Sequence, residues 1–226
     1  PARSASGSTL TMTDQLCQLA MPWTGAMREG GATAELKHDG FRCLFFRGID
    51  DVPRLWTRNG MPIEGCDHIL HRLLPIERAA GRHLFVDREL VVDGTLEATK
   101  QWIERDWRKG GDRGTFFAFD VMPFDDWRRG GSDMPLFERK TWLQRLADQV
   151  ERDPAMGWEW REGSAGRDEL TPPVVLADDE WCVSPDDVMD LAGRVWSAGL
   201  EGLMIKDATA PYRRARSAVW MKVKSA

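Results

Sequence analysis

Three short segments of this chain place lysines where they could do chemistry. A lysine amine attacks an electrophile only in its unprotonated form. Its ordinary pKa is about 10.4, so a nucleophilic lysine needs neighbouring cations or partial burial to lower that pKa. Each segment taken alone also fits a charged surface turn or the solvated face of an edge strand. The segments are KHDG at 37–40, EGLMIK at 201–206 and WMKVK at 220–224.

The joint order of six segments is more specific than any one of them. They are ELKHDGFR (35–42), TRNG (57–60), FVDREL (85–90), FFAFD (116–120), EGLMIK (201–206) and WMKVK (220–224). In this order they resemble the covalent nucleotidyltransferase superfamily, specifically the nucleotidyltransferase (adenylation) domain of ATP-dependent DNA ligases. RNA ligases and mRNA capping enzymes share the same motifs. The resemblance extends over roughly residues 13–224.

The resemblance implies a lysine nucleophile. Lys37 would attack the α-phosphate of ATP and become covalently linked to AMP. Lys222 and Lys224, with Lys206, would lie around the phosphates, where they would lower the Lys37 pKa and offset the charge of the transition state. The alternation in WMKVK predicts that Lys222 and Lys224 share one face of a strand.

The residues around the turn would meet the nucleotide, if the resemblance holds. Asp39 would position the loop, and Gly40 would permit the tight backbone turn. Arg42 would contact the ribose or an incoming DNA end. Arg58 in TRNG would contact the nucleotide or a phosphate on the DNA side, the alternative being an ordinary hairpin arginine.

Two residues are expected to recognise the base. Phe119 would stack on the purine, which gives affinity without identifying the base. Glu35, two residues before Lys37, resembles the ligase position that reads the adenine amino group, and so favours ATP over GTP. Of Phe116 and Phe117, one is expected to belong to the core.

Two carboxylates are expected to handle the ribose and a divalent metal ion, Mg²⁺ or Mn²⁺. The resemblance assigns Glu89 to a ribose hydroxyl and the metal, and Glu201 to the metal. Mg²⁺ takes one or two carboxylates together with substrate phosphates. Arg88 stands where the family often has glycine, which leaves the path of the strand near Glu89 open.

Positive charge gathers shortly before the last strand. Arg213, Arg214 and Arg216 lie within four residues of each other and precede the two lysines of WMKVK. A charge run is usually a solvated face. Here we expect the three arginines to contact the nucleic-acid backbone.

Hydrophobic periodicity indicates strands punctuated by helices without a regular βαβ rhythm. This predicts an α+β fold of two largely antiparallel sheets flanked by helices, and the resemblance implies an ATP-grasp-like nucleotidyltransferase domain. Pro75 must kink or end its helix. The segment 153–171 is predicted to be irregular. Predicted strands cover 32–36, 41–47, 54–58, 83–92, 115–122, 172–177, 202–206 and 218–224, and predicted helices 66–80, 96–109, 136–151 and 184–199.

Composition limits the class of protein. The 226 residues are 42% hydrophobic and 30% charged, which is typical of a globular chain and not of a disordered one. A net charge of −5 argues against a protein that coats nucleic acid, but allows a local basic patch. No apolar run reaches the ~20 residues of a membrane span. With no signal peptide and four dispersed cysteines, we expect a cytoplasmic protein with free thiols and no membrane partner.

The expected organisation is a flexible tail over 1–12 and one nucleotidyltransferase domain over 13–226. Ligases of this superfamily generally continue into an OB-fold, and no segment here is expected to form one. The sequence therefore predicts a monomeric DNA ligase catalytic domain that uses ATP to seal nicked duplex DNA through lysyl-AMP and an adenylated 5′-phosphate. The alternatives are an RNA ligase or capping-type nucleotidyltransferase, or a non-catalytic nucleic-acid-binding module that retains the fold.

Overall fold

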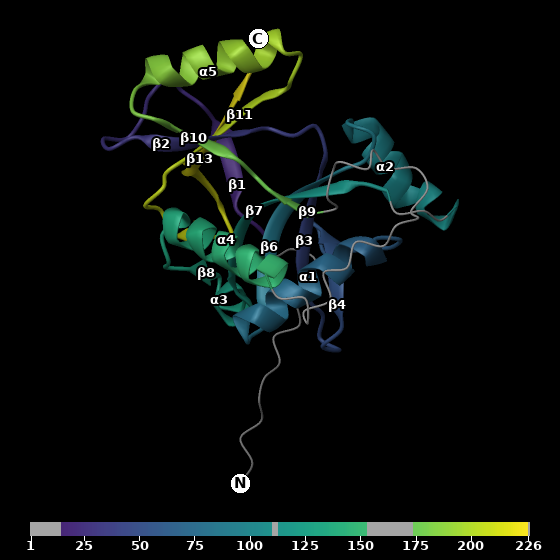
Figure 1. Cartoon of the computed structure of the whole chain (residues 1–226). Coiled ribbons are helices and arrows are strands. Elements are labelled where there is room, and N and C mark those ends of the chain that lie inside the picture. The colour runs from purple at the N-terminus through teal and green to yellow at the C-terminus, as the bar shows by residue number, and fades with distance from the viewer. Residues whose placement is uncertain (1–14, 110–112, 153–173, 226) are drawn as a thin grey trace.

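Two β-sheets form the frame of the molecule (Figure 1). The computed structural model describes residues 15–109, 113–152 and 174–225. In the larger sheet all neighbouring strands are antiparallel except β7 and β9. Its order is β5 (Pro62–Ile63), β4 (Pro53–Thr57), β3 (Phe41–Arg47), β6 (Leu84–Val91), β7 (Thr115–Pro123) and β9 (Val174–Leu176).

The second sheet has five strands and is antiparallel except where β1 runs parallel to β13. A short two-stranded pair joins β8 (Gly131–Ser132) to β12 (Tyr212–Arg213). The order of the five strands is β1 (Leu19–Pro22), β13 (Arg216–Lys224), β11 (Gly202–Lys206), β2 (Ala32–Leu36) and β10 (Asp179–Cys182). The α+β class with two largely antiparallel sheets is confirmed.

Helices cover the outer face of each sheet (Figure 1). The six-stranded sheet carries α1 (Asp67–Ala80) and α4 (Leu136–Arg152), and the five-stranded sheet carries α5 (Pro185–Ser197). The remaining helical segments are α2 (Leu96–Glu104), the short 3₁₀ helix η1 (Asp106–Lys109) and α3 (Phe124–Arg128). No helix in the described part of the chain is long and apolar enough to cross a bilayer.

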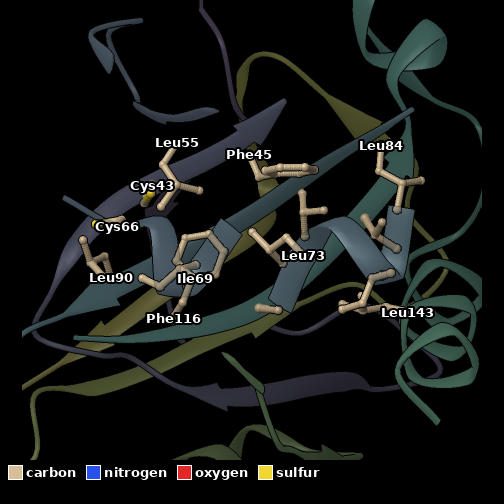
Figure 2. Close-up of a cluster of buried hydrophobic side chains, with 14 of the residues drawn as sticks. Cys43, Phe45, Leu55, Cys66, Ile69, Leu73, Leu84, Leu90, Phe116 and Leu143 are labelled. Atoms are coloured by element: carbon tan, nitrogen blue, oxygen red, sulfur yellow. The ribbon is translucent and has the colours of Figure 1, made fainter. Parts of the chain in front are cut away.

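Three hydrophobic clusters define the layers. The first lies between α1, α4 and the six-stranded sheet, where Phe45 and Phe116 meet Ile69, Leu73 and Leu143 (Figure 2). The second lies between α5 and the five-stranded sheet. Its members are Ala32, Ala34, Cys182, Val188, Leu191, Ala192, Val195, Leu203, Ile205 and Val223.

The third cluster lies between the two sheets. It joins Phe46 and Phe85 of the six-stranded sheet to Trp220 of the five-stranded sheet, with Trp127 and Tyr212 beside them. The layer order is therefore α1 and α4, the six-stranded sheet, the third cluster, the five-stranded sheet, and α5. This arrangement leaves two inner sheet faces opposite each other, and polar side chains from both can meet there.

The predicted helix ends agree with the structure where local capping decides them. Ser184 accepts a hydrogen bond from the Asp187 amide, the Asp187 side chain accepts one from the Ser184 amide, and Pro185 takes the first position of α5. Pro75 does not end α1. The helix continues to Ala80, and Gly81 caps it in a left-handed conformation with φ of 63°. The predicted helix over 96–109 breaks at Arg105, where φ is −141°.

The strands that the sequence missed are short. β1 and β10 are the edge strands of the five-stranded sheet, and each pairs with a strand far away in the sequence. Polar and exposed residues dominate β10, so it carries no alternating pattern. The predicted tail over 1–12 and the irregular segment over 153–171 lie outside the described residues.

Candidate active site

A pocket of about 630 Å³ lies between the two sheets. The five-stranded sheet contributes Trp220 and Met204, and the six-stranded sheet contributes Phe41. Most of the predicted site residues line the pocket, namely Glu35, Lys37, Arg42, Arg58, Glu89, Phe119, Lys206, Arg216 and Lys222. The others, which do not line it, are Asp39, Glu201, Lys224, Arg213 and Arg214.

The backbone holds Lys37 at the end of β2. Its amide donates to the carbonyl of Gly202, at 2.9 Å. Gly202 has a φ of +148°, and a Cβ there would lie 2.0 Å from the Val223 carbonyl oxygen, so only glycine fits. Gly40 is needed for close approach and not for a left-handed turn. Its φ is not positive, and a Cβ there would lie 2.4 Å from the Leu90 carbonyl oxygen.

Glu201 binds two lysines at once. The Lys37 Nζ lies 2.6 Å from its Oε2, and the Lys224 Nζ lies 2.6 Å from its Oε1. Burial raises the pKa of Glu201, but the two ammonium groups outweigh it, and the net pKa is lowered. The side-chain partner of Lys37 is thus a carboxylate. Lys222 lines the pocket from the same strand as Lys224, whereas Val223 between them is buried in the second cluster.

A buried group of charges surrounds Glu35. The Lys206 Nζ lies 2.5 Å from Glu35 Oε2, and the Lys140 Nζ lies 2.8 Å from Oε1. The Lys206 Nζ also lies 4.2 Å from the centroid of the Phe119 ring and 4.3 Å from that of Trp220. Burial lowers the pKa of Lys206 more than Glu35 raises it. Lys206 was expected beside the phosphates, but its contacts are with Glu35 and these aromatic rings.

A β-bulge positions Phe119. In the ladder between β6 and β7, Asp87 pairs with Asp120 and Arg88 pairs with Ala118, so Phe119 is an extra residue without a cross-strand partner. Ala118, directly before it, belongs to the first cluster, whereas Phe119 lines the pocket. The bulge therefore directs an aromatic side chain of β7 toward the site.

Arg42 is fixed beside this aromatic ring. Its Nε and Nη2 donate to the Asp87 carboxylate at 2.5 and 2.6 Å, and the Tyr212 hydroxyl donates to the same carboxylate at 2.5 Å. Burial lowers the pKa of Arg42, but Asp87 outweighs that effect and the pKa is raised. The guanidinium carbon lies 4.7 Å from the centroid of the Phe119 ring. Arg42 is therefore a permanent, oriented cation in the pocket wall.

The Glu89 side chain has no hydrogen-bond or ion-pair partner in the described part of the chain, although its backbone belongs to the β6 ladders. Burial raises the pKa of its carboxyl to about 7, against the lowering effect of Arg42 and Lys37, and the Glu201 charge adds to the rise. Within the described residues no three His, Cys, Asp or Glu side chains form a metal-binding group. Two interacting carboxylates do fit a Mg²⁺ ion that takes its other ligands from substrate phosphates.

Arg88 does not disturb the path of β6. Its pairing with Cys43 of β3 is in regular register, and the register shift beside it in the ladder to β7 comes from the extra residue Phe119. The Arg88 side chain is fully buried, with its guanidinium carbon 3.8 Å from the Phe116 ring centroid. No described residue accepts a hydrogen bond from the guanidinium, and burial lowers its pKa well below the ordinary range. Glu89, the next residue, consequently faces the pocket.

The predicted nucleic-acid arginines separate in space. Arg216 lines the pocket and donates to the Ala20 carbonyl at 2.7 Å. Arg213 donates to the Ser132 carbonyl at 3.0 Å and forms an ion pair with Asp133. Arg214 packs on Trp127, with its guanidinium carbon 5.0 Å from the ring centroid. Asp39, on the turn after Lys37, accepts a hydrogen bond from the Leu96 amide at 3.3 Å and so ties the turn to α2.

Four further residues of the site region were not singled out from the sequence. His38 lines the pocket and stacks on Phe117, with ring centroids 3.8 Å apart, and burial lowers its pKa. Trp220 and Lys100 also line the pocket, and Lys140 lies behind Glu35. Of these four residues, only Trp220 could have been found from the sequence, because its spacing of two from Lys222 places it on the same face of the strand as the two lysines of WMKVK.

Comparison with known proteins agrees with this geometry. The family model of the ATP dependent DNA ligase domain matches residues 15–224. A search of curated proteins gives no match. Among solved structures, the chain is similar to the ATP-dependent DNA ligase from bacteriophage T7 in complex with ATP, with 15% identity and a TM-score of 0.68 over 93% of this chain and 68% of that one.

Two other solved structures give the same result. A protein named Pmar-Lig_PreS3 shows 19% identity and a TM-score of 0.72 over 92% of this chain. A Lig E DNA ligase shows 20% identity and a TM-score of 0.62, over 92% of this chain and 68% of that one. At these identities the likeness shows the fold. The chain spans about half the length of Pmar-Lig_PreS3, of which 46% is covered.

The family match covers nearly the whole described chain, and it falls on a two-sheet fold whose central pocket carries the ordered motifs. The chain therefore belongs to the ATP-dependent DNA ligase domain family.

Proposed function

We propose that this chain is the catalytic domain of an ATP-dependent DNA ligase that seals nicks in duplex DNA through a lysyl-AMP intermediate. The observation that carries the proposal is the placement of Lys37 in one pocket with an aromatic ring, Phe119, and a buried acceptor, Glu35. Such a pocket recognises a base and presents an amine to the phosphates of the same nucleotide. Family membership and the likeness to a ligase solved with ATP support ATP as the substrate.

In the first step the Lys37 Nζ lone pair attacks the α-phosphorus of ATP. A P–N bond forms, and the bond to the bridging oxygen breaks so that pyrophosphate leaves with its electron pair. Attack needs a free, neutral amine, and in the structure the Lys37 Nζ lies in an ion pair 2.6 Å from Glu201 Oε2. Nucleotide binding must therefore loosen this ion pair, and the Glu201 carboxylate is the acceptor already in contact with the proton that leaves.

In the later steps AMP moves from Lys37 to the 5′-phosphate of the nick, and the 3′-hydroxyl displaces AMP to close the backbone. Lys222, in the pocket wall, and Lys224, next to Glu201, would offset negative charge on the transferring phosphate. Arg42 cannot lose its charge near neutral pH, so it would serve as a fixed cation for the ribose or the incoming end.

A divalent ion, Mg²⁺ or Mn²⁺, fits the carboxylates present. Glu201 and Glu89 would hold it together with phosphate oxygens, and when bound it would supply positive charge to the phosphates. Glu201 contacts two ammonium groups, so a metal would compete with Lys37 for it. Glu89 would bind a metal best above its pKa of about 7, where it is ionised.

Nicked duplex DNA is the proposed polymer substrate, bound by a monomer. Arg58, Lys100 and Arg216 lie in the pocket wall on loop, helix and strand, and would contact phosphates next to the nick. Arg213, which is exposed, would reach the backbone further away, whereas Arg214 packs inward on Trp127. A cytoplasmic location is supported by four cysteines that are all unpaired and buried, as in a reducing compartment.

The test is labelling of the protein with [α-³²P]ATP and Mg²⁺. Wild type should form a covalent adduct that survives denaturing gel electrophoresis, and Lys37→Arg, which keeps the charge but removes the nucleophile, should form none. Lys109→Ala is the control because Lys109 pairs with Asp106 at 3.1 Å, outside the pocket wall, and should leave the adduct unchanged. No adduct in wild type, or an equal adduct in Lys37→Arg, would overturn the proposal.

The two alternatives are separated by the same preparation. Stronger labelling by GTP than by ATP would indicate a capping-type enzyme, and sealing of nicked RNA in preference to nicked DNA would indicate an RNA ligase. Binding of nicked DNA without any lysyl adduct would indicate a non-catalytic module. The Lys37–Glu201–Lys224 contact speaks against that last reading, because a binding module needs no such arrangement around a lysine amine.

A further inference from the structure

A continuous row of charged side chains leads away from the wall of the pocket. It links Asp179 of β10, Lys140 of α4, Glu35 of β2 and Lys206 of β11. The Lys140 ammonium lies 2.8 Å from Glu35 Oε1 and also forms an ion pair with Asp179. Asp179 and Glu35 are register partners on paired strands. Lys140 therefore separates two carboxylates that would otherwise repel each other.

Lys140 reaches this position from the other sheet. Helix α4 packs on β7 of the six-stranded sheet, and the Lys140 side chain extends to the edge of the five-stranded sheet. Lys140 does not line the pocket. Glu35 does, as does Ala177, whose carbonyl oxygen accepts from Lys140 at 3.5 Å. Lys140 thus acts on the pocket only through the groups that it holds.

The orientation of the Glu35 carboxylate decides which group of a ligand the pocket can recognise. An ionised carboxylate only accepts hydrogen bonds, and its two oxygens offer about four lone-pair positions. Lys140 and Lys206 occupy one position on each oxygen, which leaves the others for a ligand. Glu35 is buried, with 3% of its side chain exposed, so the two ammonium groups and not solvent set the orientation of its carboxylate.

We propose that Lys140 is a positioning residue that makes Glu35 selective for the 6-amino group of adenine. It holds the Glu35 carboxylate in one orientation, so that the pocket accepts from an amino group and disfavours the 6-oxo group of guanine. The inference rests on the proposed function, which assigns Glu35 to the base, and adds the residue that fixes the selectivity. Without Lys140, Glu35 keeps one partner and faces Asp179 directly.

The experiment compares three nucleotides: ATP, GTP and purine riboside triphosphate, which lacks any group at position 6. Their dissociation constants are measured by calorimetry, and lysyl-nucleotide formation by labelling, for wild type, Lys140→Met and Lys140→Arg. Lys140→Met should weaken the binding of ATP about 10- to 100-fold, as expected for the loss of a charged hydrogen bond. The affinity for the purine analogue should be nearly unchanged. The preference for ATP over that analogue therefore collapses, and Lys140→Arg should restore most of it.

A matched control removes a positive charge that pairs with the same strand, β10. Arg194 of α5 pairs with Glu180, the neighbour of Asp179, at 3.0 Å in an exposed position. Arg194→Met should leave the affinities for all three nucleotides unchanged. Thermal unfolding of each variant distinguishes two causes of weaker binding. A loss of folding lowers the affinity for all three nucleotides alike, whereas a loss of selectivity lowers the affinity for ATP alone.

Equal losses for the three nucleotides, or a wild type with no preference for ATP over the purine analogue, would overturn the role of Lys140. A wild type that prefers ATP in binding but forms no lysyl-AMP would overturn the proposed function while leaving the role of Lys140 supported. A wild type that binds none of the three nucleotides would overturn both.

Discussion

The pKa values of Glu201 and Glu89 shift in opposite directions because their surroundings differ. Glu35 and Glu201 each contact two lysine ammonium groups, and the pKa of Glu201 is lowered although burial acts the other way. Glu89 is buried without such a partner, and its pKa rises to about 7. Ion pairing therefore outweighs desolvation at Glu201, and desolvation dominates at Glu89. Perturbation of this kind is frequent at functional sites.

Glu89→Gln should make the protein more stable at alkaline pH. The folded-state pKa of about 7 lies above the ordinary 4.5, so between these values the folded protein keeps a proton that the unfolded chain releases. Stability consequently falls as pH rises through this window and stays lower above it. At pH 8 the substitution should raise the free energy of unfolding by about 2–3 kcal/mol, or ~5–10 °C in Tm.

The measurement is thermal unfolding of Glu89→Gln and wild type at pH 4 and pH 8. At pH 4 the difference should vanish, because Glu89 is protonated in both states. Glu29→Gln, in an exposed loop, is the control and should show no such pH dependence. Adduct formation by Glu89→Gln should fall despite its higher stability. A stability difference of equal size at both pH values would contradict the raised pKa.

At the scale of elements, one helix fixes both sheets at the pocket. Arg139 and Asp120 form a fully buried ion pair at 2.6 and 2.9 Å, which joins α4 to the strand that carries Phe119. Arg139 also donates to the Ala210 carbonyl at 3.2 Å. The next residue, Lys140, holds Glu35 on the other sheet. Adjacent residues of α4 therefore stabilise the bulged strand and orient the Glu35 carboxylate.

Arg139→Met should lower the free energy of unfolding by about 3–5 kcal/mol, because it leaves the Asp120 carboxylate buried and unpaired. The measurement is urea unfolding followed by circular dichroism. Arg129→Met is the control: Arg129 pairs with Asp126 in an exposed position, so its loss should cost less than about 1 kcal/mol. Adding Asp120→Asn to Arg139→Met should recover part of the loss. Equal costs for the two single variants would contradict the importance of the buried pair.

At the scale of the whole molecule, charge is distributed unevenly. The chain carries a net charge of −5, yet its central pocket is lined by Lys37, Arg42, Arg58, Lys100, Lys206, Arg216 and Lys222, against two glutamates. A cavity of one sign between low-dielectric walls concentrates the field, so a local site can attract phosphates although the protein as a whole is acidic.

Removal of cations from the pocket wall should change the salt dependence of DNA binding. The double substitution Arg58→Ala and Arg216→Ala should weaken binding of a nicked duplex, and should reduce the slope of log K against log salt by about 1 for each lost phosphate contact. Arg194→Ala, on α5 outside the pocket, is the control and should leave the slope unchanged. The measurement is fluorescence anisotropy over a salt series, and an unchanged slope in the double variant would place the DNA elsewhere.

The sequence by itself determined the family, the order of the motifs and most of the long elements. These are properties of neighbouring residues: strands β2, β3 and β11 follow from alternating or apolar runs, and α5 follows from its capping box. The turn that we propose carries the nucleophile could be located because K-x-D-G and the segments after it keep their order along the chain. At Pro75 local signals allowed either a kink or an end of the helix, and the helix continues to Ala80.

Only the tertiary structure decided which charged groups meet. The Lys140–Glu35 and Lys206–Glu35 contacts join residues 105 and 171 positions apart, and they depend on how two sheets face each other. The bulge at Phe119 depends on cross-strand register, and the inward packing of Arg214 on Trp127 depends on a neighbouring helix. A charged side chain carries no periodic signal for its partner, so its role follows from the packing that surrounds it.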